Sequence, residues 1–159
     1  MKKYLLTSIA LLTLLIGCQS TSETASSNSG QCTTGDKSSV NLTMNDFNAS
    51  VLECGGVAID ADALAGTTAN FSFDGKRKRI AYFDGKGNVT YQMIDKRTTQ
   101  QVAYSVTEEG YLELKWPDGE VWYWSKLNET SDGWLLKTYW ESKDGKEKEI
   151  FNLAVKLNK

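Results

Sequence analysis

The stretch that decides the fold is QVAYSVTEEGYLELKWPDGEVWYWSKL, residues 101–127. It contains three runs rich in β-branched and aromatic residues, separated by the turn signals Glu108-Glu109-Gly110 and Pro117-Asp118-Gly119. We interpret both turns as three-residue hairpin loops with a glycine in the left-handed position. Because side chains alternate along a strand, this register predicts one apolar, buried face. That face consists of Val102, Tyr104, Val106, Leu112, Leu114, Trp116, Trp122 and Trp124. The opposite face, with Ala103, Ser105, Glu113, Lys115 and Ser125, is predicted to face water.

The β pattern extends from Leu64 to the end of the chain, with short turns that carry Asp-Gly pairs. Eight strands are predicted, at residues 67–73, 78–84, 88–95, 101–107, 111–116, 120–127, 134–142 and 148–157. Sequential antiparallel strands leave unpaired edges, which closure into a barrel removes. We therefore expect an all-β fold over residues 64–159: an eight-stranded antiparallel up-and-down meander closed as a barrel. A two-sheet β-sandwich of the same strands is the alternative.

The amino-acid composition limits the kinds of function that the protein can have. The 159 residues carry a net charge of −2, so no large basic or acidic field indicates a nucleic acid or a highly charged partner. Histidine is absent, which removes a histidine general base and the commonest nitrogen ligand of transition metals. We expect a protein that is not an enzyme and that holds no cofactor and no metal.

The N-terminus has the pattern of an export signal. Lys2 and Lys3 precede an apolar run, residues 5–16, which is short for a membrane-spanning helix. The run ends in Leu15-Ile16-Gly17-Cys18, which resembles the lipobox of bacterial lipoproteins. The resemblance implies cleavage of a signal peptide (1–17), lipidation of the Cys18 sulfur and attachment to a membrane. An ordinary secretory peptide with an incidental Cys18 is the alternative. In a Gram-negative source, Gln19 in place of aspartate points to the outer membrane, facing the periplasm.

Two segments connect this anchor to the β region. Residues 18–31 are rich in Ser and Thr, and beyond Cys18 they carry no large apolar side chain, so we interpret them as a flexible tether. Residues 32–63 are predicted to contain a short helix that starts near Asn45. Its inner side would carry Met44, Phe47, Val51 and Leu52. Cys32 and Cys54 flank this helix, and in an exported protein they are expected to form a disulfide. A redox or metal role is the alternative, although a CxxC spacing is absent.

The β region resembles lipocalin-like (calycin) domains, which are eight-stranded meanders. The resemblance covers residues 64–157 and depends on topology, turn spacing and the motif Trp-Pro-Asp-Gly-Glu-Val-Trp at 116–122. The Gly-x-Trp signature of true lipocalins would fall at Gly66, where Thr68 stands in place of the tryptophan. The resemblance implies a barrel with an interior that holds one small ligand.

The inner aromatic face is the candidate binding site, with Tyr104, Leu114, Trp116, Trp122, Trp124 and Trp140 as candidate ligand-binding residues. These side chains either fill the barrel core or line a cavity for a small lipophilic or aromatic ligand. Trp134 and Trp140 point inward in one register of the 128–133 loop and outward in the other. If outward, they would form an exposed apolar patch.

The basic run Lys76-Arg77-Lys78-Arg79 is interpreted as a solvated guard of a strand edge, with attraction to anionic lipid headgroups as the alternative. Together these features predict a membrane-anchored envelope lipoprotein with a non-catalytic binding module. The alternative is a protein-interaction module, such as an assembly factor or an inhibitor of a wall-degrading enzyme.

Overall fold

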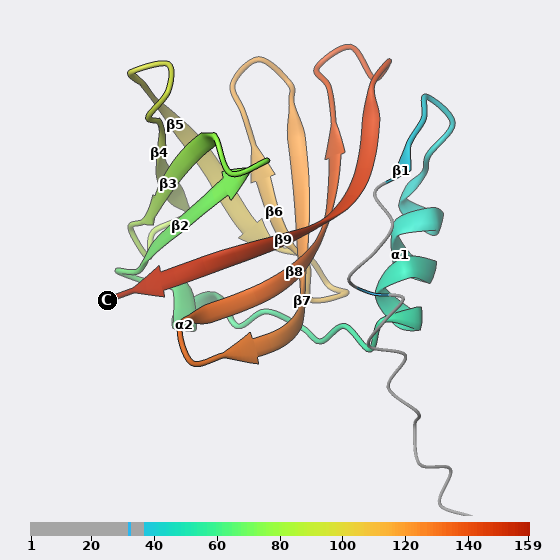
Figure 1. Cartoon of the computed structure of the whole chain (residues 1–159), viewed down its shortest axis with the longest axis horizontal. Helices are drawn as coiled ribbons and strands as arrows, with labels where there is room; N and C mark the ends of the chain where they lie inside the picture. The colour runs from blue at the N-terminus through green and yellow to red at the C-terminus, as the bar shows by residue number, and fades with distance from the viewer. Residues whose placement is uncertain (1–31, 33–36) are drawn as a thin grey trace, which may run out of the picture.

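The computed structural model describes residue 32 and residues 37–159, which form one antiparallel β-sheet and two helices (Figure 1). The strands are β1 (Lys37–Ser38), β2 (Thr68–Phe73), β3 (Arg77–Phe83), β4 (Asn88–Met93), β5 (Thr98–Val106), β6 (Leu112–Lys115), β7 (Val121–Thr130), β8 (Gly133–Glu141) and β9 (Lys148–Asn158). The helices are α1 (Met44–Glu53) and α2 (Ala61–Leu64). The predicted signal peptide, Cys18 and the tether lie outside the described residues.

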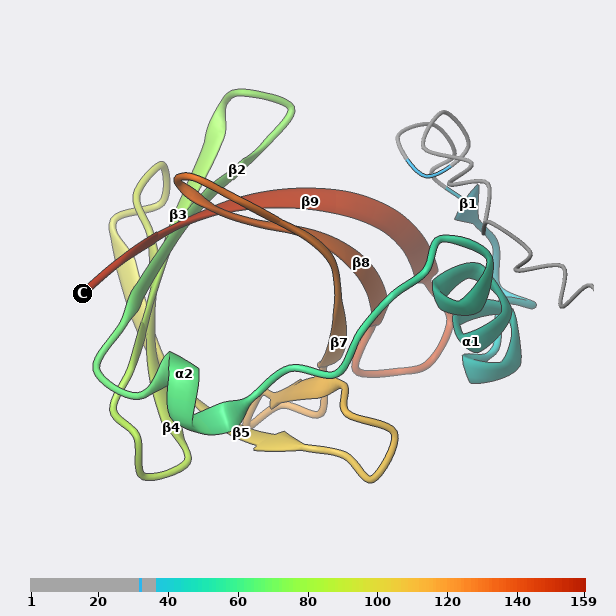
Figure 2. The same ribbon diagram turned by 90° about the horizontal axis from the view of Figure 1, so that it is seen from below.

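The sheet closes on itself. Its strand order is β1-β9-β2-β3-β4-β5-β6-β7-β8, and β8 also pairs with β9. Val155 of β9 pairs with Phe71 of β2 on one side and with Trp134 of β8 on the other. Figure 2 looks along the resulting ring of strands. This arrangement confirms the eight-stranded meander closed as a barrel, and a two-sheet sandwich is excluded.

The predicted hairpin registers are confirmed. The Thr107 N–H donates to the Tyr111 carbonyl at 2.8 Å, and the Trp116 N–H donates to the Glu120 carbonyl at 2.9 Å. As a result, Leu114 pairs with Trp122 across β6 and β7. All eight residues of the predicted apolar face belong to, or pack against, the core inside the barrel.

The orientation of the C-terminal tryptophans follows from an irregularity in β7. The pairing of β7 with β8 shifts register between Lys126 and Asn128, as expected for a β-bulge. Trp140 pairs with Trp122, and Trp134 is 7% exposed within the core. Both tryptophans therefore point into the barrel.

The prediction that the outer face of β5, β6 and β7 is exposed to solvent is partly wrong, because the N-terminal segment covers part of this face. Helix α1 packs outside the barrel beside β8 (Figure 2), where Phe47 contacts Tyr139 at 6.0 Å between ring centroids. The chain after α1 bridges Val57 to Lys126, and Ser125 next to it is fully buried. Glu113 is also buried, at 9% exposure.

Helix α1 begins where the sequence favours it. The Thr43 side chain accepts from the Asp46 N–H, and the Asp46 carboxylate accepts from the Thr43 N–H at 2.8 Å, which is a capping box. Phe47 and Val51 face the barrel as predicted, but Leu52 is 83% exposed, so its prediction as an inner residue is wrong. No helix in the described part of the chain is long and apolar enough to cross a membrane.

One end of the barrel is closed by the segment around α2. Ile59 and Leu64 are buried in the barrel core there. The Ile59 N–H donates to the Gly110 carbonyl at 2.9 Å. A Cβ at Gly110, whose φ is +83°, would lie 2.4 Å from the Cβ of Ala58. Glycine in the β5–β6 turn is thus required for both its backbone conformation and this close contact.

Candidate functional site

The opposite end of the barrel contains a cavity of about 760 Å³. Its lining residues lie at and beside the turns that join β2 to β3, β4 to β5, β6 to β7 and β8 to β9, and these turns are at the end of the barrel away from α2 (Figure 1). Because residues two apart share a face, inward side chains at or just beyond this end of each strand line the cavity. The barrel is therefore closed at the α2 end and has a recess at the other end.

Five aromatic rings lie at the base of this cavity, and we call them the aromatic floor: Phe73, Tyr91, Trp116, Trp122 and Phe151. Neighbouring rings are 5.3 to 6.4 Å apart between centroids, mostly edge to face. Such contacts fix the rings against one another. The floor is thus a packed cluster of rings, in which Phe73 and Phe151 are partly exposed while Tyr91, Trp116 and Trp122 are at most 7% exposed.

A carboxylate is held beside this floor. The Oε1 atom of Glu120 accepts from the Nε1 atoms of Trp122 at 2.8 Å and of Trp140 at 2.7 Å. Trp122 and Trp140 are cross-strand partners on β7 and β8, so their indole N–H groups converge on one acceptor. Two hydrogen bonds to one charged oxygen orient both the carboxylate and the rings.

A buried cation lies on the other side of the cavity. Arg79 is 6% exposed, and its Nη1 atom donates to the Lys78 carbonyl at 2.9 Å and to the Asp95 carboxylate. Its guanidinium carbon lies 5.7 Å from the centre of the Phe73 ring. Burial raises the pKa of the neighbouring Tyr91 phenol above its ordinary value of 10, although the Arg79 cation acts in the opposite direction.

The predicted site residues divide into two groups. Trp116, Trp122 and Trp140 line the cavity. Tyr104, Leu114 and Trp124 lie deeper and do not line it: Tyr104 packs on Phe83 with ring centroids 5.2 Å apart, and Leu114 and Trp124 are at most 1% exposed. The core-filling interpretation therefore fits these three, whereas the cavity interpretation fits the other three.

Sequence reasoning missed several lining residues. The prediction that the basic run forms a solvated edge is wrong for Arg79, although Lys76, Arg77 and Lys78 are exposed as predicted. Arg79 alternates with Ala81 and Phe83 on the inner face of β3. Glu149 likewise precedes Phe151 and Leu153 in the alternation of β9. The alternation of side chains along β3 and β9 is therefore the sequence signal that predicts an inward position for both residues.

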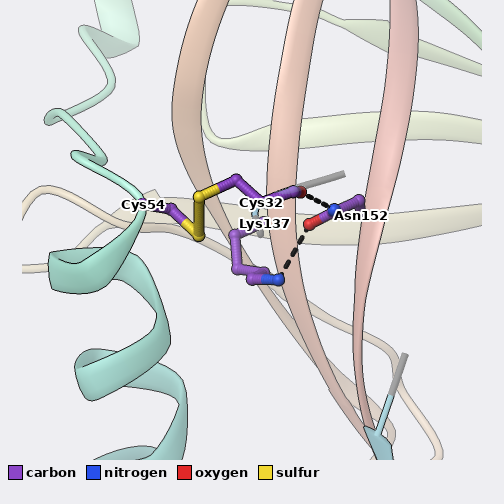
Figure 3. Close-up of a disulfide and its surroundings, with 4 residues drawn as sticks. All are labelled: Cys32, Cys54, Lys137 and Asn152. Carbon is purple, nitrogen blue, oxygen red and sulfur yellow. Dashed lines mark hydrogen bonds between the residues drawn. A yellow bond between two sulfur atoms is a disulfide. The ribbon is translucent and has the colours of Figure 1, made fainter. Parts of the chain in front are cut away.

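The predicted disulfide between Cys32 and Cys54 is present, with 5.4 Å between the Cα atoms (Figure 3). It joins residue 32 to the end of α1, beside β8 and β9. The Asn152 side-chain amide donates to the Cys32 carbonyl and accepts from the buried Lys137 ammonium at 2.8 Å. This cluster holds the N-terminal segment against the outside of the barrel, and its Asn152 directly follows Phe151 of the aromatic floor on β9.

Within the described residues, no group of three or more His, Cys, Asp or Glu side chains is arranged to hold a metal ion. The chemistry of the cavity is therefore that of aromatic rings, carboxylates and cations. No family model, curated protein or solved structure matches this chain.

Proposed function

We propose that the barrel is a non-catalytic binding module for a small molecule with a flat aromatic or lipophilic body. The observation that carries the proposal is the aromatic floor at the base of the 760 Å³ cavity. Small-molecule sites typically enclose roughly 300–1,000 Å³ and combine apolar walls with a few oriented polar groups. Glu120, fixed by two indole N–H groups, is such a group.

We further propose that the module is a lipoprotein of the bacterial envelope, tethered through Cys18. The lipobox-like Leu15-Ile16-Gly17-Cys18 and the Ser/Thr-rich residues that follow it support this location. The disulfide between Cys32 and Cys54 supports an oxidising compartment. For a Gram-negative source, Gln19 favours the periplasmic side of the outer membrane. Kinship with lipocalin-like domains is part of the same proposal, supported by the closed eight-stranded meander with one covered end.

Binding of N-phenyl-1-naphthylamine, a flat neutral probe that fluoresces in apolar sites, tests the proposal. We expect saturable binding, and we expect Trp140→Leu to weaken it about fivefold, since a good aromatic contact contributes about 1 kcal/mol. Trp140 is partly exposed at the cavity, so the variant should remain folded.

The matched control is Tyr82→Leu, because Tyr82 is an aromatic residue on the outer face of β3 with 44% exposure. It should leave the probe affinity unchanged. Equal loss in both variants, or probe fluorescence that does not saturate, would show that the cavity is not the binding site.

A further inference from the structure

The cavity lining contains more carboxylates than basic groups. Five acidic side chains line it: Asp74, Asp118, Glu120, Glu147 and Glu149. Three basic side chains line it: Arg77, Arg79 and Lys96. Charge in a recess is screened less than charge on an open surface. The excess of negative charge therefore influences which ligands enter the cavity.

Ion pairs neutralise most of the positive charge. Arg77 pairs with Asp74 at 3.4 Å, and buried Arg79 pairs with Asp95, which lies just outside the lining. Four lining carboxylates have no ion-pair partner among the described residues: Asp118, Glu120, Glu147 and Glu149. Lys96 is the remaining lining cation, so the unpaired charges sum to four negative against one positive.

Two of these carboxylates lie next to the aromatic rings. Glu120 accepts from the indoles of Trp122 and Trp140. Glu149 is the cross-strand partner of Trp140 on β9 and precedes Phe151 of the floor by two residues on the same face. Tryptophan side chains and carboxylates thus lie next to one another in the cavity.

We infer that the cavity accepts an organic cation, a small molecule whose ammonium group contacts the aromatic floor beside Glu120 and Glu149. This inference depends on the proposed function and specifies its ligand class. Aromatic faces attract ammonium groups, tryptophan most strongly, and quaternary ammonium groups are typically bound by several rings together. An anionic ligand would meet the unpaired carboxylates, and the Arg79 guanidinium is already paired with Asp95.

Three probes test the charge requirement: phenyltrimethylammonium, its shape-matched neutral carbon analogue tert-butylbenzene, and the anion benzoate. Binding to the full-length protein is followed by NMR through the indole N–H signals of Trp122 and Trp140. We expect phenyltrimethylammonium to bind about tenfold more tightly than tert-butylbenzene, and benzoate to bind more weakly than either.

Glu149→Gln removes one carboxylate without touching the hydrogen bonds of Glu120. It should weaken phenyltrimethylammonium binding at least about threefold and leave tert-butylbenzene unaffected. Glu108→Gln is the matched control, because Glu108 is exposed in the β5–β6 turn at the closed end of the barrel.

Three outcomes separate this inference from the proposed function. Equal affinity for phenyltrimethylammonium and tert-butylbenzene would overturn the cation inference while leaving aromatic binding intact. Tightest binding of benzoate would also overturn it and would assign the recognition to Arg79. Binding of none of the three probes would contradict both the inference and the proposed function.

Discussion

Arg79 and Asp95 form an ion pair inside the open end of the barrel, although they belong to different strands and turns. The Arg79 side chain is 6% exposed and the Asp95 side chain 31% exposed. A cation of this kind requires its partner, because transfer of an unpaired charge from water into a protein interior is costly. The pair therefore allows a guanidinium to lie beside the apolar rings of the cavity.

Asp95→Asn should lower the free energy of unfolding by about 2 kcal/mol. This is less than the ~3–5 kcal/mol typical of fully buried pairs, since Asp95 is partly exposed. The measurement is urea unfolding at neutral pH. Asp74→Asn is the control: its pair with Arg77 is more than half exposed on both sides, so it should cost less than ~1 kcal/mol. Equal costs would mean that Arg79 is solvated in solution.

Glu113 predicts an acid-sensitive contribution to stability. Burial alone would raise its pKa, but hydrogen bonds from Lys115, Tyr123 and Ser105 outweigh this effect and hold the pKa below the ordinary value of 4.5. The Tyr123 hydroxyl donates to Glu113 at 2.7 Å. A carboxyl with a lower pKa in the folded state stabilises the protein above its unfolded pKa and loses that contribution as the pH falls.

We therefore expect the free energy of unfolding to fall as the pH decreases below about 4.5, and we expect Glu113→Gln to make this decrease shallower. The effect should be below ~1 kcal/mol, because Glu113 retains some solvent contact and the Lys115 partner is exposed. Urea unfolding midpoints from pH 7 to pH 3 provide the measurement. Identical pH profiles for the variant and the parent protein would contradict the assignment.

The disulfide should contribute about 3 kcal/mol to stability. Cys32 and Cys54 are 22 residues apart, and a cross-link of this span restricts the unfolded chain by roughly that amount in the chain-entropy model. The double variant Cys32→Ser, Cys54→Ser should unfold at lower urea and show no response to a reducing agent. Mass spectrometry of the untreated protein should find two hydrogens fewer than after reduction. Two free thiols there would argue against the bond.

Cys18→Ser should abolish membrane attachment and leave an unprocessed precursor. The reason is that the proposed anchor is the Cys18 sulfur, which serine cannot replace. Labelling cells with a radioactive fatty acid checks this, because only the parent protein should incorporate label. Equal label in both proteins would exclude Cys18 as the anchor.

The fold could be predicted because its signals are local. The turns at Gly110 and Gly119 set two registers, and alternation then correctly predicts the inner face from Val102 of β5 to Trp124 of β7, although it does not include Gln100, which precedes the predicted strand. Closure could be expected as well, since exposed edge strands are unfavourable. The covered part of the outer face could not, because burial of Ser125 depends on the distant segment at Gly56 and Val57 that packs over it.

The cavity was only partly predictable. Alternation identifies Trp116, Trp124 and Leu114 alike as inward residues, but it does not say which end of the barrel is filled. That distinction depends on Ile59 and Leu64, which close one end, and on the four turns around the other. The prediction that Arg79 is exposed is wrong because a run of four basic residues resembles a solvated strand edge. Alternate members of the run nevertheless face opposite sides of the strand.

Trp124→Ala separates the filled part of the barrel from the open part. Trp124 is 1% exposed and contacts the rings of Phe71 at 5.6 Å and Phe83 at 6.4 Å. Its indole N–H has no hydrogen-bond partner among the described residues, so truncation removes packing rather than a polar contact. We expect a loss of about 3–5 kcal/mol, as for other large-to-small changes in a core.

Trp140→Ala, at the cavity, should cost only about 1 kcal/mol, because part of this side chain is already in water. Lys115→Ala should cost less than ~1 kcal/mol, since the Lys115 side chain is 58% exposed on the outer face and its ion pair with Glu113 is open to solvent on that side. Urea unfolding midpoints of the three variants give the order. A Lys115 variant as unstable as the Trp124 variant would show that the inner and outer faces of β6 and β7 have been exchanged.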